Sequence, residues 1–150
     1  MNLQLVILGT GDLKYQQVLK KYAEKYPKKI SLNLRFDDPL AHKIYAGSDF
    51  FLMPSCYEPC GLGQMISLRY GSIPLVYKTG GLADTVNKEN GFIFDVYNKD
   101  VLVETIGQAA GLFNDKKIWA SLVKNAMQLD FSWGRSAKKY LELYAKAKAR

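Results

Sequence analysis

A carboxylate and two glycines lie close together in residues 55–64, with the sequence SCYEPCGLGQ. Glu58 stands three residues before Gly61, where the next helix is expected to begin. Backbone N–H groups at the start of a helix lack intrahelical partners and favour anions and hydroxyl oxygens. A carboxylate beside them can accept hydrogen bonds from sugar hydroxyls, or it can act only as a charge at the helix start. The local pattern leaves both roles of Glu58 open.

A second glycine turn follows a predicted strand and has the sequence Lys78-Thr79-Gly80-Gly81-Leu82. Two successive glycines let backbone amides approach an anion without intervening side chains, and the lysine can add a positive charge. The same pattern also fits an ordinary connecting turn with a surface lysine. We expect a helix after this turn, with Asp84 and Thr85 capping or opening the next one.

Two other motifs give weaker indications of a ligand or metal site. Gly9 and Gly11 follow a predicted strand as in dinucleotide-binding turns, but Lys14 stands where the third glycine would fall. We therefore expect a tight strand-to-helix turn at this point. Cys56 and Cys60 form a C-x3-C pair in a chain with one histidine, which is a poor zinc ligand set and no disulfide framework. The sequence predicts no metal and no cofactor.

Short apolar runs alternate with helical patterns along the chain, which predicts a Rossmann-like α/β fold: a parallel sheet with helices on both faces. The expected strands are residues 3–8, 30–34, 50–53, 73–76 and 92–94. The expected helices are residues 13–26, 40–46, 61–69, 101–113, 118–128 and 136–148. In such a fold, ligands bind beyond the carboxyl ends of the strands. The candidate site loops are therefore residues 9–12, 35–39, 54–63 and 77–82.

Composition narrows the class of protein further. The 150 residues suit one domain, and 48% hydrophobic with 23% charged residues is typical of a globular chain rather than a disordered one. No apolar run approaches the roughly 20 residues of a membrane span. The net charge of +7 suits an anionic partner, but the lysines gather on predicted helices as solvated faces and no nucleic-acid-binding motif is present. We expect a cytoplasmic protein that binds neither membranes nor nucleic acid.

Residues 53–86, MPSCYEPCGLGQMISLRYGSIPLVYKTGGLADTV, resemble the signature of bacterial glycogen synthases and plant starch synthases. Three further stretches agree in order: LVILGTGD, DDPLAHKIYAGSDFFL and LDFSWGRSAKKYLELY. The resemblance implies a GT-B glycosyltransferase, with two Rossmann-like domains, that transfers glucose from ADP-glucose to the non-reducing end of an α-1,4-glucan with retention. Residues 1–150 would then be its C-terminal, donor-binding domain, truncated at its N-terminal side.

The resemblance also implies roles for individual residues. Glu58 would be the catalytic group that binds the hydroxyls of the donor glucose. The positions that would bind the rest of the donor are Leu34, Phe36, Cys60, Gly61, Leu62, Gln64, Lys78, Thr79, Gly80 and Gly81. Among them, Phe36 and Leu34 would contact the adenine, Gln64 would lie near the nucleotide, and the second glycine turn would contact the phosphates. The sequence departs from the pattern at Ile66, where the broader family has a second glutamate, and at Gly63, where threonine is common.

The same resemblance sets expectations for partners. ADP-glucose or ADP would bind this chain, whereas the α-1,4-glucan acceptor would bind the missing N-terminal domain. Because the family's diphosphate-clamping arginine and lysine would precede this chain, we expect the chain alone to be inactive. The alternative is a non-catalytic nucleotide or sugar-nucleotide binding module. Residues 136–148 place Ala137, Tyr140, Leu141 and Tyr144 on one helical face, which would pack either on the missing domain or on this one.

Overall fold

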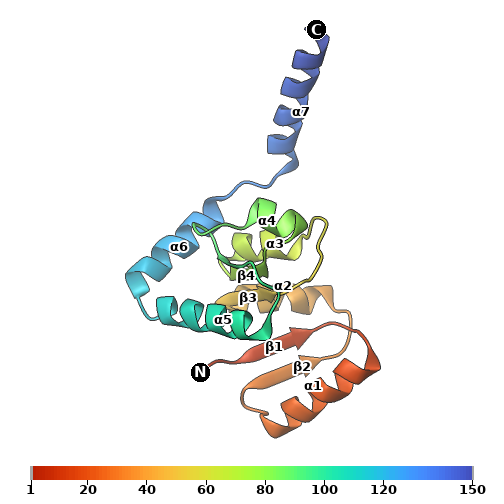
Figure 1. The fold of residues 1–150 in the computed structure, drawn as a ribbon, viewed down its shortest axis with the longest axis vertical. Helices are drawn as coiled ribbons and strands as arrows, with labels where there is room; N and C mark the ends of the chain where they lie inside the picture. Colours follow the sequence, from red (N-terminus) through yellow and green to blue (C-terminus); the bar gives the residue numbers. More distant parts are fainter. Residues whose placement is uncertain (1, 150) are drawn as a thin grey trace. The chain divides into compact units, whose positions relative to one another are not determined.

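The computed structural model describes residues 2–149, which form two compact units, one up to Ser48 and the other from Asp49 onward (Figure 1). Each unit has its own parallel sheet. The expected alternation of strands and helices is confirmed from β1 to β5, and the expected succession of helices follows it, but the strands form two sheets and not the expected one. No helix within residues 2–149 has the length and apolar character needed to cross a membrane.

The first unit is a two-stranded sheet with two helices. Its elements are β1 (Leu5–Leu8), α1 (Leu13–Lys25), β2 (Ile30–Asn33) and α2 (Asp38–Gly47). β1 and β2 are parallel, with Leu5 opposite Ile30, and α1 packs on β2. Neither helix has a buried residue. This unit therefore has a thin core.

The second unit holds a three-stranded sheet in the order β3-β4-β5. Its elements are β3 (Phe50–Met53), α3 (Gly63–Tyr70), β4 (Ile73–Tyr77), α4 (Gly80–Thr85), β5 (Phe92–Phe94), α5 (Lys99–Phe113), α6 (Lys116–Gln128) and α7 (Trp133–Lys148). Both strand pairs are parallel, with Met53 opposite Val76 and Val76 opposite Ile93. All three strands therefore end at the same edge of the sheet.

The core of the second unit lies on both faces of β4. On one face, Ile73 packs in a cluster with Trp119 of α6, and Leu75 packs with Ala109 of α5. On the other face, Val76 packs with Leu82 and Val86, in and just after α4. A strand with helices on both faces must be apolar throughout, which explains the continuous IPLV run.

The helix starts agree with their local chemistry. Side chains cap four helices by accepting backbone N–H bonds: Asp37 for α2, Asn98 for α5, Asp115 for α6 and Ser132 for α7. Pro39 occupies the first turn of α2, where its missing N–H costs nothing. One expectation was wrong: Asp84 and Thr85 do not open the following helix but form the last turn of α4. The next helix begins only at Lys99.

The last helix, α7, has no buried residue. Tyr140, Leu141 and Tyr144, which the sequence places on one apolar face, are all exposed. Packing of this face on a part of the protein outside this chain stays a prediction.

Candidate functional site

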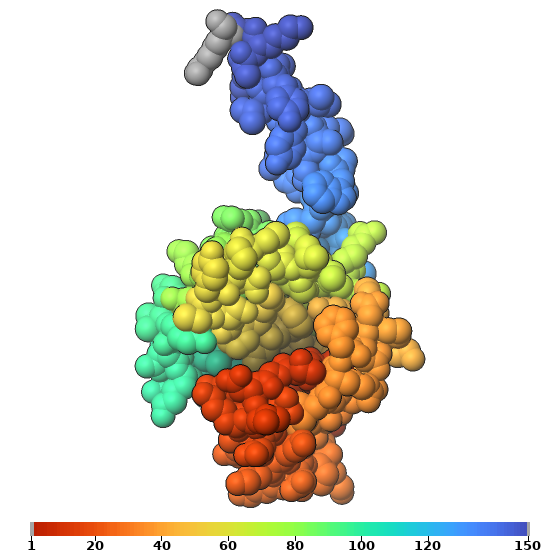
Figure 2. Space-filling model, turned by 90° about the vertical axis from the view of Figure 1, so that its right-hand side faces the viewer, coloured from red at the N-terminus to blue at the C-terminus, as the bar shows by residue number. Residues whose placement is uncertain are grey.

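Two loops meet at the carboxyl ends of adjacent strands in the second unit. Residues 54–62 follow β3, and residues 78–79 join β4 to α4. The Gly81 N–H donates to the Glu58 carbonyl oxygen at 3.0 Å, which ties the second loop to the first. Figure 2 shows the first loop, in yellow, at the surface of this unit. The two segments that the sequence singles out for chemistry therefore lie side by side.

The glycines of the second loop permit this close approach. A Cβ atom at Gly80 would overlap the carbonyl oxygen of Glu58, and one at Gly81 would overlap the backbone of Cys60. Gly80 also has a φ of +39°, a left-handed conformation that side chains disfavour. Because the Gly81 N–H is already bonded within the protein, it is not the open anion-binding amide that the sequence pattern suggests. Whether Gly80 and Gly81 contact a donor stays a prediction.

The Glu58 carboxylate is half-buried and makes few hydrogen bonds within the protein. Its recorded hydrogen-bond partner is the Ser55 hydroxyl, at a long 3.5 Å. Within residues 2–149, no ion pair involves Glu58. The start of α3 has Leu62 as its N-cap and no side-chain cap bond, so Glu58 does not cap that helix. The carboxylate thus keeps lone pairs for hydrogen bonds from a ligand.

Gln64, in the first turn of α3, is fully buried. Its amide nitrogen donates to the carbonyl oxygens of Cys60 at 3.1 Å and Gly61 at 2.9 Å, and to the Thr85 hydroxyl at 3.1 Å. The Thr85 hydroxyl in turn donates to the Gly81 carbonyl at 2.7 Å. This network joins the first loop to α4. The position of Gln64 near the nucleotide stays a prediction.

The other second-unit candidates lie at the surface of the same loops. Cys60 and Leu62 are exposed, and Gly61 is half-buried with a φ of +72°. Lys78 is exposed, and its backbone N–H donates to the Phe94 carbonyl. The carbonyl of the half-buried Thr79 accepts the first helical bonds of α4. These backbones are fixed at their sheet and helix ends, and the lysine side chain extends into solvent.

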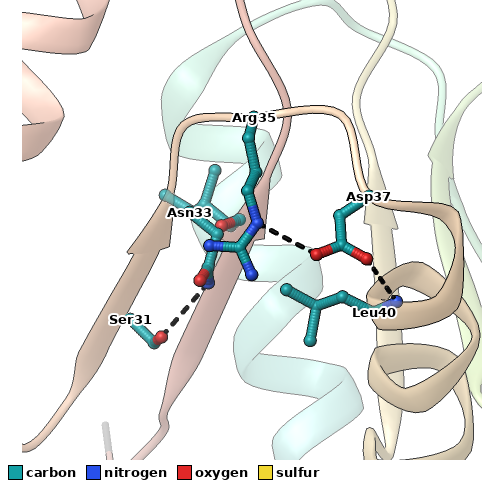
Figure 3. Close-up of polar contacts among 6 residues, drawn as sticks. Ser31, Asn33, Arg35, Asp37 and Leu40 are labelled. Carbon is teal, nitrogen blue, oxygen red and sulfur yellow. Dashed lines mark hydrogen bonds and ion pairs between the residues drawn. The ribbon is translucent and has the colours of Figure 1, made fainter.

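Leu34 and Phe36 lie in the first unit, on the loop between β2 and α2. Arg35 Nε donates to Asp37 Oδ2 at 2.9 Å, and Asp37 Oδ1 accepts the Leu40 N–H at 2.9 Å (Figure 3). These two hydrogen bonds hold the pKa of the Asp37 carboxyl below its ordinary value, the backbone N–H having the larger effect. The Phe36 side chain is 94% exposed. The loop therefore has an ordered base and presents its aromatic ring to solvent.

Sequence reasoning missed the polar residues that hold these loops in place. The sequence pattern suggests only a place at a helix end for Thr85, and it predicts no role for Ser55 or Arg35. Arg35 has a local signal, an acidic residue two positions away. The role of Thr85 has none, because its partner Gln64 is 21 residues earlier in the chain. Within residues 2–149, no cluster of three or more histidine, cysteine or acidic side chains could hold a metal ion.

Parallel strands with glycine turns at their carboxyl ends define a Rossmann-like, ligand-binding class of α/β protein. Within that class, the chain belongs to the family of glycosyl transferases group 1, whose family model matches residues 1–129. The expected resemblance and the expected GT-B glycosyltransferase fold class are thereby confirmed.

Curated relatives agree with this membership. The chain is 53% identical to the glycogen synthase of Fervidobacterium nodosum, over 99% of this chain and 32% of that protein. It is 54% identical to the glycogen synthase of Clostridium perfringens, over 95% of this chain and 31% of that protein. The chain thus spans about a third of the length of these relatives.

A solved structure gives the same result. The fold matches the catalytic domain of starch synthase IV from Arabidopsis thaliana, bound to ADP and acarbose, with a TM-score of 0.84. The two sequences are 37% identical, and the match covers 98% of this chain and 33% of that chain. Two independent comparisons therefore place the chain beside enzymes of storage-glucan synthesis.

Proposed function

We propose that this chain is the donor-binding part of a glycogen or starch synthase, which transfers glucose from ADP-glucose to the non-reducing end of an α-1,4-glucan with retention. The observation that carries the proposal is the similarity to glycogen synthases over 99% of the chain. The acceptor glucan binds the part of the enzyme outside these residues. Both cysteines are free, as in a reducing compartment, so we place the enzyme in the cytoplasm.

We propose the following chemistry for this site. Cleavage of the sugar–phosphate bond leaves negative charge on ADP, which fixed backbone amides stabilise as it develops. The Glu58 carboxylate accepts hydrogen bonds from the glucose hydroxyls, and its charge favours a cation-like sugar ring. Holding the glucose in one orientation is itself a large part of such catalysis. Phe36 stacks on the adenine, with the Leu34 backbone beside it.

A non-catalytic nucleotide or sugar-nucleotide binding module is the second candidate. It would hold its ligand at the same strand-end loops without transferring a sugar. Supplying the remaining two-thirds of a related glycogen synthase in trans separates the two candidates. Incorporation of glucose into glucan by the mixture, and by neither part alone, supports the enzyme. Binding of donor without any incorporation supports the module.

The proposal is tested by titrating the chain with ADP-glucose, ADP and UDP-glucose while following its amide NMR signals. Chemical-shift changes are expected at Phe36, in residues 58–64 and in residues 79–82, with ADP-glucose binding better than UDP-glucose. Glu58→Gln keeps the shape of the side chain and removes its charge. We expect it to weaken ADP-glucose binding about tenfold and to leave ADP binding nearly unchanged, because charged hydrogen bonds are the stronger ones.

Glu104→Gln on the exposed side of α5 is the matched control, and it should change neither affinity. Equal weakening of ADP and ADP-glucose by Glu58→Gln would contradict the sugar-binding role of this residue. No binding of any of the three nucleotides at millimolar concentration would contradict a donor site in this chain.

A further inference from the structure

The orientation of the buried Gln64 amide is set by the groups around it. Its nitrogen faces two backbone carbonyl oxygens, which can only accept hydrogen bonds. Its third partner is the Thr85 hydroxyl. Because this hydroxyl donates its hydrogen to the Gly81 carbonyl, it accepts the hydrogen bond from Gln64. A reversed amide would place its oxygen against three acceptors. The Cys60 and Gly61 carbonyls and the Thr85 hydroxyl therefore together fix which way the Gln64 amide points.

The Gln64 amide in turn fixes two consecutive peptide groups. The Cys60 carbonyl belongs to the same peptide group as the Gly61 N–H, and the Gly61 carbonyl to that of the Leu62 N–H. No peptide bond is cis within residues 2–149, and in a trans peptide the N–H points opposite to the C=O. Because both carbonyls point inward to Gln64, both N–H groups point away from it. Within the described residues, no recorded hydrogen bond uses either N–H.

We infer that Gln64 and Thr85 are positioning residues that aim the Gly61 and Leu62 N–H groups at the ligand and do not contact it themselves. The identity of that ligand, the glucosyl group and diphosphate of ADP-glucose, rests on the proposed function. Fixed N–H donors stabilise developing charge without reorganising, so their direction matters as much as their presence.

The burial of Gln64 argues against a direct contact with the donor. The residue has no exposed surface, and both hydrogens of its nitrogen are engaged by three protein acceptors. Its Oε1 atom has no hydrogen-bond partner in the described structure and is also buried. A Cβ atom at Gly61 would lie only 2.5 Å from that oxygen and so would displace the amide, and the φ of +72° at this residue also favours glycine.

Thr85→Val tests the inference, because valine has nearly the shape of threonine and lacks the hydroxyl. The matched control is Thr105→Val in α5. Thr105 is buried and Thr85 is half-buried, and the Thr105 hydroxyl donates to the Val101 carbonyl one turn earlier at 2.8 Å, as that of Thr85 does to Gly81. Both variants lose the same kind of intrahelical bond, and only Thr85→Val also removes one of the three hydrogen-bond partners of Gln64. Thr85→Ser keeps the hydroxyl and should restore the wild-type behaviour.

Without ligand, we expect Thr85→Val to shift and broaden the amide NMR signals of Gly61 and Leu62, and Thr105→Val to leave them unchanged. With ligand, Thr85→Val should weaken ADP-glucose binding about tenfold, the order of one or two lost hydrogen bonds, and ADP binding less. Thr85→Ser should recover both readouts. A loss of stability alone would be the same in the two valine variants.

Unchanged Gly61 and Leu62 signals in Thr85→Val would overturn the inference. So would equal weakening of ADP and ADP-glucose, since the sugar would then not depend on these amides. Failure of the wild-type chain to bind ADP-glucose overturns the proposed function instead. In that case the ligand-free comparison of the two valine variants still decides whether Gln64 and Thr85 hold the amides in place.

Discussion

The strands β1 and β4 have similar sequences and very different surroundings. Both are short apolar runs, LVIL and IPLVY. Leu5 of β1 is 42% exposed, whereas Leu75 of β4 is 2% exposed. β4 has a strand on each side and helices on both faces, and β1 has β2 as its partner in a two-stranded sheet. Burial is therefore decided by the neighbours that a strand acquires and not by its own sequence.

The same contrast separates the loops that carry candidate residues in each unit. In the second unit, the loop that carries Glu58 is held by backbone contacts to Gly80 and Gly81 and by the buried Gln64 amide. In the first unit, the loop that carries Phe36 is held by an exposed ion pair and a helix cap. The second-unit residues are thus fixed by packing, and the first-unit residue by local polar contacts.

The largest expected effect is a loss of stability on truncating a core side chain, and it should differ between the two units. Leu75→Ala should lower the free energy of unfolding of the second unit by about 3 kcal/mol, because it leaves a cavity between β4 and α5. Leu5→Ala should lower that of the first unit by under about 1 kcal/mol, because its side chain is already partly in water. Amide hydrogen exchange of β4 and β1 measures each opening free energy separately.

Exchange in β1 should be faster than in β4 even without substitution, since the first unit has the thinner core. Equal protection of the two strands, or equal losses in the two variants, would mean that the first unit has a core comparable to that of the second. The contrast between the units would then be one of exposure and not of stability.

The next effect tests whether backbone contact holds the Glu58 loop. Gly81→Ala should destabilise the second unit by about 2 kcal/mol, because the new Cβ atom overlaps the Cys60 backbone. Gly11→Ala is the matched control: a Cβ atom there meets nothing within 4 Å, and its φ is not left-handed. We expect that variant to change stability by less than about 0.5 kcal/mol.

Urea unfolding followed by the fluorescence of the buried Trp119, in a Trp133→Phe background, measures the effect of Gly81→Ala, and far-UV circular dichroism measures that of Gly11→Ala. A Gly81→Ala variant as stable as the unchanged chain would show that the loop moves aside without cost. The close approach of the two loops would then be incidental to the site.

Sequence reasoning succeeded where the signal is local. The apolar run of β4 and the helical periodicity of residues 101–113 and 118–128 predict elements that the structure confirms with shifts of one or two residues. The glycine turns at 61–63 and 80–81 point to the loops that meet in the structure. In each case, the backbone preference and the side-chain pattern lie within a few residues of each other.

Sequence reasoning failed where a contact joins residues that are far apart in the chain. The Gln64–Thr85 hydrogen bond joins residues 21 apart, and the Gly81 N–H is taken by a carbonyl 23 residues earlier. No local pattern of residue types predicts either contact. The pairing of β1 in a two-stranded sheet cannot be read from its own four residues. The sequence predicts a helix after the second glycine turn but not its bounds, because the six residues of α4 are too few to show a repeating apolar pattern.

The smallest expected effect concerns the polar contacts that hold the Phe36 loop. The Leu40 N–H and the Arg35 side chain hold the pKa of the Asp37 carboxyl below its ordinary value of 3.8. A carboxyl whose pKa is lower in the folded state stabilises the fold at pH values above its unfolded pKa, and this contribution is lost as the pH falls through the folded pKa. Asp37→Asn keeps an acceptor for the helix cap and removes the charge.

We therefore expect the first unit of the unchanged chain to be slightly more stable than that of Asp37→Asn at pH 6, with the difference declining below about pH 4, the unfolded value, and vanishing once the folded carboxyl is protonated. Amide exchange in α2 across this pH range measures the difference. Arg35→Gln should move the decline to higher pH, because the carboxyl then keeps only its backbone partner. A difference between the unchanged chain and Asp37→Asn that does not vary with pH would show that the shape of the cap, and not its charge, holds the loop. The first-unit loop would then be fixed by geometry, as the second-unit loop is.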